Sequence, residues 1–556
     1  MKFKALLITT SMMCVALPQT YAGKWFVKVD SPSGNDGKTW ETAFNLADCI
    51  TSFSSMAKGD DVYFAGGKYT YPALQASGNA LVTGLKMQNN PVNLHGGYAT
   101  NLTGTEVPEI SYPSDTPTIL DGDRNNNGIP DGGDVRNLIF VQTTNVKSEA
   151  AAAPQSVLIE GFTLQNAYYN GTKGTELGAL NVDMTRTVTV RNCIFRNNKC
   201  ENAGAAFSNS GSQTHFIDCI FEENTGKDAG IAVNQSKRGD ADKYFKPSAT
   251  LERCLVASNN AVGEGKVAGG SAIRVNAGSV YIINSTVTGN KGYKQGAIHI
   301  NDATGLYIAS STISDNSEEY PANGSAIYAT GTPSIRIINS YVLGMENDPD
   351  IAAISLAEMT TKVSDVLVSD GGNIFGKCDF FAAETGGEAF VDNFSNDVVI
   401  PGYDDYKSAN TPYAIFGRSG LQDKGGFSKV LVPQVMAQYF KKNDFAGLFK
   451  TEYKCPVDVI DTVDQRNEER PEMISVGAYD QGAGSGVSDV MLQVETAIAQ
   501  VGDGIYRLAQ ESTSIIVYDI SGNVVWHGSG SEVNLSGKSR GIYLIRTDYA
   551  SFKVLR

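Results

Sequence analysis

The clearest feature of this chain is a pattern of apolar and polar positions that repeats between residues 157 and 345. Each copy starts with an alternating β-branched run, passes a small residue into a second short apolar run, and ends at a turn. The copies read VLIEGFTLQN, VTVRNCIFRNN, HFIDCIFEEN, TLERCLVASN, VYIINSTVTGN, LYIASSTISDN and IRIINSYVLG. Alternation of this kind predicts strands, and a repeat length of about 20 to 50 residues predicts a solenoid.

Two positions recur in each copy. The small residue is Gly161, Cys193, Cys219, Cys254, Ser285, Ser311 and Ser340, at spacings of 32, 26, 35, 31, 26 and 29 residues. Six copies carry an asparagine five residues later: Asn166, Asn198, Asn224, Asn259, Asn290 and Asn316. Asparagine tolerates left-handed backbone and bonds to backbone groups at turns, so we expect an amide ladder inside the solenoid. The cysteines are interpreted as small core residues; Cys193 and Cys200 either pair or remain free.

This repeat resembles the right-handed parallel β-helix of the pectate-lyase-like superfamily, which implies an all-β fold. The start, WFVKVDSPSGNDG, and DTVDQRNEERPEMISVGAYDQG from Asp461 resemble the two ends of secreted β-helix proteins of the choice-of-anchor type. We therefore expect a β-helix domain over residues 23–482. Between about 346 and 455 the coil spacing is lost, and irregular C-terminal coils are expected there.

After a Gly/Ser linker at 483–489, residues 490–556 read as short strands separated by glycine turns, which predicts a small β-sandwich. SIIVYDISGNVVWHG and RGIYLIRTD resemble the C-terminal sorting domain of the type IX secretion pathway. The resemblance implies that the secretion machinery is a partner. A plain immunoglobulin-like end domain is the alternative.

Residues 1–22 have the pattern of a secretory signal peptide. Lys2 and Lys4 precede an apolar stretch, and Thr20 and Ala22 suit a cleavage site. A secreted or cell-surface location is therefore expected, and no later stretch is apolar enough to predict a transmembrane segment.

The formal net charge of −15 falls to −17 without the two lysines of the leader. An acidic chain disfavours a nucleic-acid partner, and a polyanionic ligand would need a local basic strip. Lys237, Arg238 and Lys243 lie in an inserted loop and are candidates for that strip. A monomer is expected.

The segment DRNNNGIPDGGD has the spacing of an EF-hand-type calcium loop. The oxygen ligands at positions 1, 3, 5, 7, 9 and 12 would come from Asp123, Asn125, Asn127, Ile129 (backbone carbonyl), Asp131 and Asp134. Asp at position 12 is shorter than the usual Glu, and two Asn replace charged ligands. A structural calcium ion is therefore predicted, with a solvated polar turn as the alternative.

A second group appears when the strands that follow Gly or Ala are aligned. One position reads Asn181, Ser208, Asn234, Arg274, His299 and Tyr328, and the position two residues later includes Asp183, Asn276, Asn301 and Thr330. Strand side chains alternate between faces, so this set is predicted to line one outward face. Arg274, His299 and Tyr328 would then lie on consecutive strands.

These residue types suit cleavage of a uronate polysaccharide by β-elimination, which needs a charge neutraliser, a base and an acid. Arg274 and Asn234 are assigned to the carboxylate, and His299 and Tyr328 to proton transfer, His299 because histidine titrates near neutrality. Asn181, Asn276 and Asn301 are candidates for substrate binding. The resemblance to β-helix polysaccharide lyases points to the same outward face.

Two alternatives stay open. A non-catalytic adhesin or glycan-binding protein would use the same flat face without turnover. A hydrolase needs clustered carboxylates, and Asp183 is alone in its column. His95 and His215 show no constellation in the sequence.

Overall fold

The computed structural model describes most of the chain. The described residues are 22–72, 83–88, 90–142, 156–169, 178–185, 187–200, 204–208, 211–227, 230–234, 246–262, 269–293, 295–301, 304–318, 324–346, 352–357, 363–376, 378–380, 415–434, 438–481, 498–502, 504–519, 523–547 and 551–556. Residues 1–21 of the predicted signal peptide and the basic residues Lys237, Arg238 and Lys243 lie outside them.

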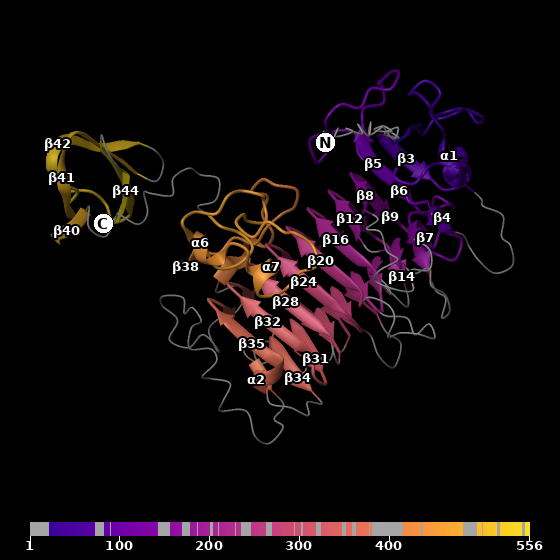
Figure 1. Cartoon of the computed structure of the whole chain (residues 1–556). Helices are drawn as coiled ribbons and strands as arrows, with labels where there is room; N and C mark the ends of the chain where they lie inside the picture. Colours follow the sequence, from indigo (N-terminus) through magenta and orange to yellow (C-terminus); the bar gives the residue numbers. More distant parts are fainter. Residues whose placement is uncertain are drawn as a thin grey trace, which may run out of the picture.

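Four parallel sheets form a β-helix, which confirms the predicted all-β solenoid (Figure 1). Sheet A contains β1 (Lys24–Val27), β2 (Asp61–Ala65), β5 (Asn93–Tyr98), β8 (Ser156–Glu160), β12 (Thr187–Arg191), β16 (Gln213–Ile217), β20 (Ser248–Glu252), β24 (Ser279–Ile283), β28 (Gly305–Ala309), β32 (Ser334–Ile338) and β35 (Leu367–Gly371). Sheet B contains β3 (Gly67–Thr70), β6 (Thr118–Asp121), β9 (Phe162–Gln165), β13 (Ile194–Arg196), β17 (Ile220–Glu222), β21 (Leu255–Ala257), β25 (Thr286–Thr288), β29 (Thr312–Ser314), β33 (Tyr341–Val342) and β36 (Ile374–Phe375).

The other two sheets complete each coil. Sheet C contains β4 (Thr83–Gln88), β7 (Asn137–Gln142), β11 (Leu180–Asp183), β15 (Ala206–Ser208), β19 (Ile231–Val233), β23 (Ile273–Val275), β27 (Ile298–Ile300), β31 (Ile327–Thr330), β34 (Ile354–Ala357) and β37 (Cys378–Phe380). Sheet D contains the two-residue strands β10 (Tyr168–Tyr169), β14 (Lys199–Cys200), β18 (Thr225–Gly226), β22 (Asn260–Ala261), β26 (Lys291–Gly292) and β30 (Ser317–Glu318). The chain passes through sheets C, A, B and D in that order.

The turn from sheet A to sheet B is a single left-handed residue, followed by the small residue of the repeat. The left-handed residues are Asn192, Asp218, Arg253, Asn284, Ser310 and Asn339. The small residues behind them stack in a buried column, where the Cys254 N–H donates to Ser285 Oγ and the Ser285 N–H to Ser311 Oγ. Gly161 is an exception to the predicted column: it lies level with Asn192 and takes the left-handed position itself, with φ of 76°.

The predicted amide ladder is present inside the solenoid. Asn198 Nδ2 donates to Asn224 Oδ1 (3.0 Å), and the same contact links Asn224 to Asn259, Asn259 to Asn290 and Asn290 to Asn316. Each of these amides also bonds to backbone, so the buried polar groups are satisfied. The left-handed residue is the one before each ladder asparagine, and Asn166 is itself such a turn residue, one position outside the ladder.

One hydrophobic core runs through the coils, made of the inward residues of sheets A, B and C. At its amino-terminal end lies helix α1 (Leu46–Ser52), which Asn45 caps by accepting the Asp48 N–H, followed by the short 3-10 helix η1 (Phe53–Ser55). α1 buries Leu46 and Cys49 against the first coils. The alternation read from the sequence therefore places the apolar residues where packing requires them.

The segment from residue 415 to 481 does not continue the coils but packs along their flank. It contains the 3-10 helix η5 (Gly417–Ser419), β38 (Gln438–Lys441), α6 (Lys442–Phe445), α7 (Leu448–Thr451) and β39 (Met473–Ser475). β39 pairs with β38 antiparallel. Phe445, Phe449 and Tyr453 pack on the outward side chains of β24, β28 and β32, and Figure 1 shows α7 beside these strands. Fully buried Arg470 holds the segment in place by donating to Asn284 Oδ1 and to Gly477 O.

Short helix α2 (Val363–Val366) precedes β35. The tail forms an antiparallel sheet of β40 (Ile498–Gly502), β41 (Ile505–Asp519), β42 (Val524–Asn534), β43 (Ile542–Arg546) and β44 (Ser551–Leu555), with its own apolar cluster.

None of the described helices has the length and apolar character needed to cross a membrane. Cys193 and Cys200 are both free and buried.

Candidate functional site

Arg274, His299 and Tyr328 lie side by side on three adjacent strands of sheet C, as predicted. In the register of the sheet, Arg274 on β23 is level with His299 on β27, and His299 with Tyr328 on β31. The His299 and Tyr328 rings stack with centroids 5.5 Å apart. Ile273 and Ile298, which directly precede Arg274 and His299 in the chain, are buried in the core. Because strand side chains alternate, the three polar side chains share the outward face.

The same register corrects the predicted column at two positions. Arg274 is level with Ala232, so Asn234 lies two residues further along, level with Asn276. Ser208 is level with Val233 and not with Ala232, so it is not at the level of Arg274 either. The number of residues between the glycine and the first core residue differs between coils, so aligning the strands by their glycines shifted these two. Asn234 is still outward, but it is not beside Arg274 as the proposed carboxylate site requires.

A row of amides and hydroxyls runs parallel to this line. Asn301 Nδ2 donates to Asn276 Oδ1 (3.0 Å), Thr330 Oγ1 donates to Asn301 Oδ1 (3.2 Å), and Arg274 Nε donates to Asn276 Oδ1 (2.8 Å). All four side chains are partly exposed. The row holds the guanidinium of Arg274 in place and offers further groups to a ligand.

His299 differs from its predicted role. His299 is only 3% exposed, and neither of its ring nitrogens has a hydrogen-bond partner. Burial, helped by the Arg274 guanidinium, lowers the pKa of His299 to about 3. The imidazole is therefore neutral at physiological pH and a weak base, so the expectation of a histidine that titrates near neutrality is wrong.

Asn181 also differs from its prediction as a substrate contact. Asn181 and Asp183 on β11 are fully buried, although both belong to the outward set. Asp183 accepts a hydrogen bond from Gln142 Nε2 (2.8 Å). Asn181 and Asp183 are therefore closed to a ligand, whereas Arg274, Tyr328 and the amide row are partly exposed.

The predicted calcium loop is closed by its own hydrogen bonds. Asp123 accepts the N–H groups of Asn127 and Gly128, and Asp134 accepts those of Arg124 and Asp131. Asn125 and Asn127 donate their side-chain amides to Asp131. Ile129 is exposed, and its N–H donates to Asn127 Oδ1. Within the described residues, no three carboxylate, histidine or cysteine side chains lie close enough together to hold a metal ion.

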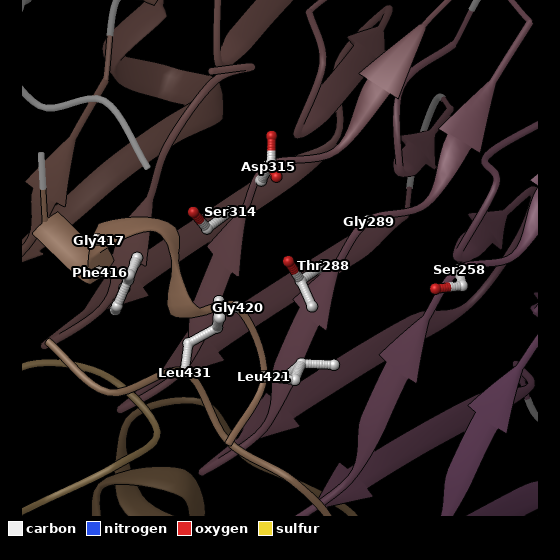
Figure 2. Close-up of a pocket in the computed structure, with 10 residues that line it drawn as sticks. All are labelled: Ser258, Thr288, Gly289, Ser314, Asp315, Phe416, Gly417, Gly420, Leu421 and Leu431. Carbon is white, nitrogen blue, oxygen red and sulfur yellow. The ribbon is translucent and has the colours of Figure 1, made fainter. Parts of the chain in front are cut away.

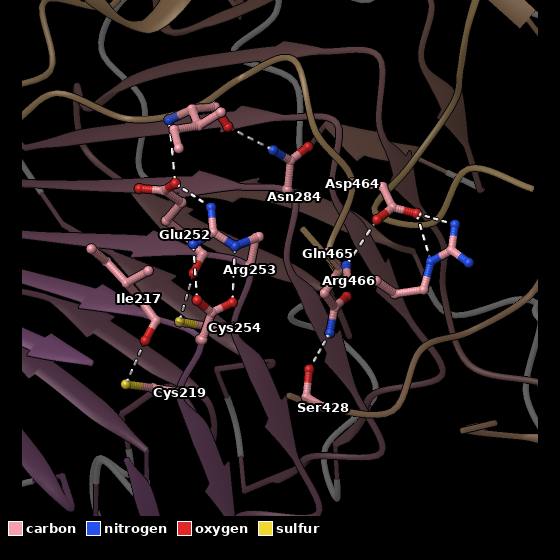
Figure 3. A network of polar contacts seen from close by, with 12 residues as sticks. Ile217, Cys219, Glu252, Arg253, Cys254, Asn284, Ser428, Asp464, Gln465 and Arg466 are labelled. Carbon is pink, nitrogen blue, oxygen red and sulfur yellow. Dashed lines mark hydrogen bonds and ion pairs between the residues drawn. The ribbon is translucent and has the colours of Figure 1, made fainter. Parts of the chain in front are cut away.

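Sheet A carries a second set of polar groups, which the sequence analysis missed. His215 Nε2 lies 2.9 Å from Glu252 Oε2. Arg253 donates to Glu252 (Figure 3) and, through two nitrogens at 2.9 Å each, to Asp218. A similar cluster joins His95 Nδ1 to Glu160 Oε1 at 2.6 Å, with Arg191 on the other carboxylate oxygen. Both histidines thus belong to clusters of charged side chains. The 31-residue spacing of Glu160 and Arg191 could have revealed one of these clusters in the sequence, because it places the two residues on neighbouring strands.

Apart from His95, these charged groups line the sheet A cleft, a cavity of about 600 Å³. Its walls come from three parts of the chain: the loop at 98–112, the outward side of β8, β12, β16 and β20, and the segment 458–467. A volume in this range is typical of ligand sites, which span about 300–1,000 Å³. The cleft is therefore large enough to admit a small ligand.

A smaller cavity of about 200 Å³ lies between the turns of sheet B and the segment around η5 (Figure 2). Thr288, Ser314 and Asp315 form one wall, and Leu421 and Leu431 lie on the other. It is below the usual size of a ligand site of about 300 Å³, so we interpret it as a packing gap.

Comparisons with known proteins add one distant structural likeness. A rhamnogalacturonan lyase matches over 64% of this chain and 74% of its own, with 15% sequence identity and a TM-score of 0.32. No family model matches the chain, and no curated protein matches its sequence.

Proposed function

We propose that this protein is a polysaccharide lyase that cleaves uronate-containing, glycosaminoglycan-like chains by β-elimination on the outward face of sheet C. The observation that carries the proposal is the register that places Arg274, His299 and Tyr328 on three consecutive strands. Strands in a sheet lie about 4.8 Å apart, so the three side chains span about 10 Å, roughly the two sugar residues that flank one glycosidic bond. Arg274 supplies the positive charge that an acidic protein needs locally for a polyanion.

In this proposal Tyr328 transfers the proton, and His299 does not act as the base expected from the sequence. Arg274 neutralises the uronate carboxylate, which makes the C5 proton more acidic. Tyr328 removes that proton as its phenolate, and its O–H returns a proton to the leaving oxygen. His299 stays neutral and positions Tyr328 through ring stacking. The amide row of Asn276 and Asn301 contacts sugar hydroxyls.

Absorbance near 230 nm tests the proposal, because β-elimination creates an unsaturated uronate. The mature chain is incubated with pectic, alginate and glycosaminoglycan polymers. We expect activity with at least one polymer, and a loss of about 100-fold or more in Arg274→Gln and Tyr328→Phe, the size expected for a group that stabilises a transition state. Arg196→Gln on sheet B is the matched control, since Arg196 is also outward and bonds a neighbouring glutamine. Absence of any absorbance change with every polymer would overturn the proposal.

A second function, glycan binding without turnover, is favoured by one observation. His299 is buried and its pKa is lowered to about 3, which leaves the face without a histidine base at neutral pH. An adhesin needs no base. Retention of acidic polymers in affinity electrophoresis, lost in Arg274→Gln and unaccompanied by absorbance at 230 nm, would establish this function instead.

Structural calcium at residues 123–134 is part of the proposal. Burial raises the pKa of the Asp134 carboxyl, and the neighbouring Asp131 and Asp123 raise it further. A divalent cation would relieve this repulsion, provided that the carboxylates turn from their present N–H partners. Calorimetric titration with calcium tests it: heat is expected for the wild type and for Asp423→Asn, an exposed control, and none for Asp131→Asn. No heat with the wild type would leave the loop a solvated turn.

Export is also proposed on the sequence resemblances alone. The leader of residues 1–22 and the tail module would direct the chain to the cell surface or the medium, with the secretion machinery as partner. Deleting residues 490–556 tests this: the truncated chain should stay inside the cell envelope. A monomer without affinity for nucleic acid is proposed as well, and its sedimentation behaviour tests the oligomeric state.

A further inference from the structure

We propose that the sheet A cleft is a second carbohydrate site, which binds an uncharged sugar residue. It lies on a different sheet from the Arg274 line and does not depend on lyase activity. The cleft has the volume of a ligand site and is built from three segments far apart in sequence. We infer its ligand from charge, rigidity and the placement of apolar groups.

Charge argues against an anionic ligand. Five acidic side chains line the cleft against two arginines and one histidine, so a uronate or a phosphate would meet net repulsion. A bare metal ion is equally unsuited, since no described group of three ligand side chains converges there. An uncharged, hydroxyl-rich molecule fits, because carboxylates accept and guanidinium groups donate hydrogen bonds to hydroxyls.

The polar groups are already held in position. Asp218 and Glu252 are fixed by Arg253, and Glu160 by His95 and Arg191. Fixed side chains lose little conformational entropy when a ligand binds. These ion pairs therefore form a rigid array of donors and acceptors and need no rearrangement to hold a sugar.

An apolar residue completes the site. Ile460 is 50% exposed although its backbone is fixed: its N–H donates to Glu252 Oε1 (3.2 Å), and its carbonyl accepts from Asn284 Nδ2 (3.1 Å). An exposed aliphatic side chain held rigidly beside polar groups provides a surface for the C–H face of a sugar ring. A sugar has this combination of one apolar face and polar edges, whereas a purely apolar ligand would desolvate the ion pairs without replacing their water.

Isothermal titration calorimetry of the full mature chain with cello-, manno-, galacto- and xylotetraose tests the proposal. We expect at least one neutral tetrasaccharide to bind, and Ile460→Asn and Arg191→Gln each to weaken binding about tenfold. Val524→Asn is the matched control, because Val524 is similarly exposed but belongs to the tail sheet. Arg274→Gln should leave neutral-sugar binding unchanged, which separates this site from the proposed lyase site.

Three outcomes would overturn it. One is that no neutral tetrasaccharide binds at millimolar concentration. Another is that uronate tetrasaccharides, titrated in parallel, bind and lose affinity in Ile460→Asn, while the neutral tetrasaccharides do not bind. The third is that binding is the same in wild type, Ile460→Asn and Arg191→Gln, which would place the sugar elsewhere on the molecule.

Discussion

The outward faces of sheet A and sheet C follow the same alternation of side chains but carry opposite polar chemistry. On sheet A, His215 and His95 each contact a glutamate, and arginines complete the clusters. On sheet C, His299 is buried without a hydrogen-bond partner beside an arginine and a tyrosine. Pairing offsets the cost of burying charged groups, whereas an unsatisfied buried polar group lowers stability and often marks a functional site.

The two faces also differ in the pKa values of their histidines, His95 on sheet A and His299 on sheet C. Burial opposes the charge of His95, but its hydrogen bonds with Asp61 and Glu160 raise its pKa above the ordinary value. Burial of His299 has no such compensation and lowers its pKa to about 3. The two faces should therefore respond in opposite directions to pH.

The largest expected effect is on sheet A. Arg253→Met leaves buried Glu252 and partly buried Asp218 without their shared cation, which should lower the free energy of unfolding by about 3–5 kcal/mol. Urea unfolding monitored by fluorescence measures it. Arg507→Met is the control: its exposed pair with Glu532, at 3.6 Å, is worth less than about 1 kcal/mol. A loss below 1 kcal/mol in Arg253→Met would break the comparison, because sheet A would then not depend on its ion pairs.

The next effect is the acid sensitivity caused by His299. Between its folded pKa of about 3 and the unfolded value near 6.5, the unfolded chain binds the proton and the folded chain does not. The stability is therefore intact above pH 6.5 and falls as the pH is lowered, by about 2–3 kcal/mol between pH 6.5 and 4.5. His299→Phe keeps an aromatic ring on Tyr328 and should remove this loss, whereas His527→Phe, at an exposed position, should not. Equal slopes in wild type and His299→Phe would contradict the assignment.

A smaller effect of opposite sign is expected for His95, because burial offsets part of the pull of its two carboxylates. Its folded pKa is raised, so its contribution is fully present below the unfolded pKa and is lost as the pH rises through the folded pKa. The stability advantage of wild type over His95→Gln should be greater at pH 5.5 than at pH 8.5 in parallel urea titrations. The reverse trend would mean that the carboxylates do not charge this histidine.

The smallest effect on stability is expected for Arg274. Its side chain is partly exposed and donates to Asn276, so Arg274→Gln should change the free energy of unfolding by less than about 1 kcal/mol. Thermal unfolding measures this change in the same preparation that is assayed for polymer cleavage. A variant that loses more than about 2 kcal/mol would show that Arg274 is structural, and the contrast between the two faces would fail.

The sequence determined the solenoid and much of its interior. Ile273, Val275, Ile298 and Ile300 alternate with polar residues because only one side of a strand faces the core. The asparagines of the ladder could be recognised because sheets A and B and the turn between them have nearly constant length, so the period is visible. This regularity also placed Arg274, His299 and Tyr328 together correctly.

Only the tertiary structure decided the level of Asn234, the burial of His299 and the ion pairs of sheet A. The connections that lead into sheet C vary in length, so core packing rather than sequence spacing sets the register there. The pairing of His95 with Glu160 spans 65 residues, and Ile460 reaches Glu252 across 208 residues. Local pattern carries no information on such contacts, because they depend on how distant segments pack against the finished coils.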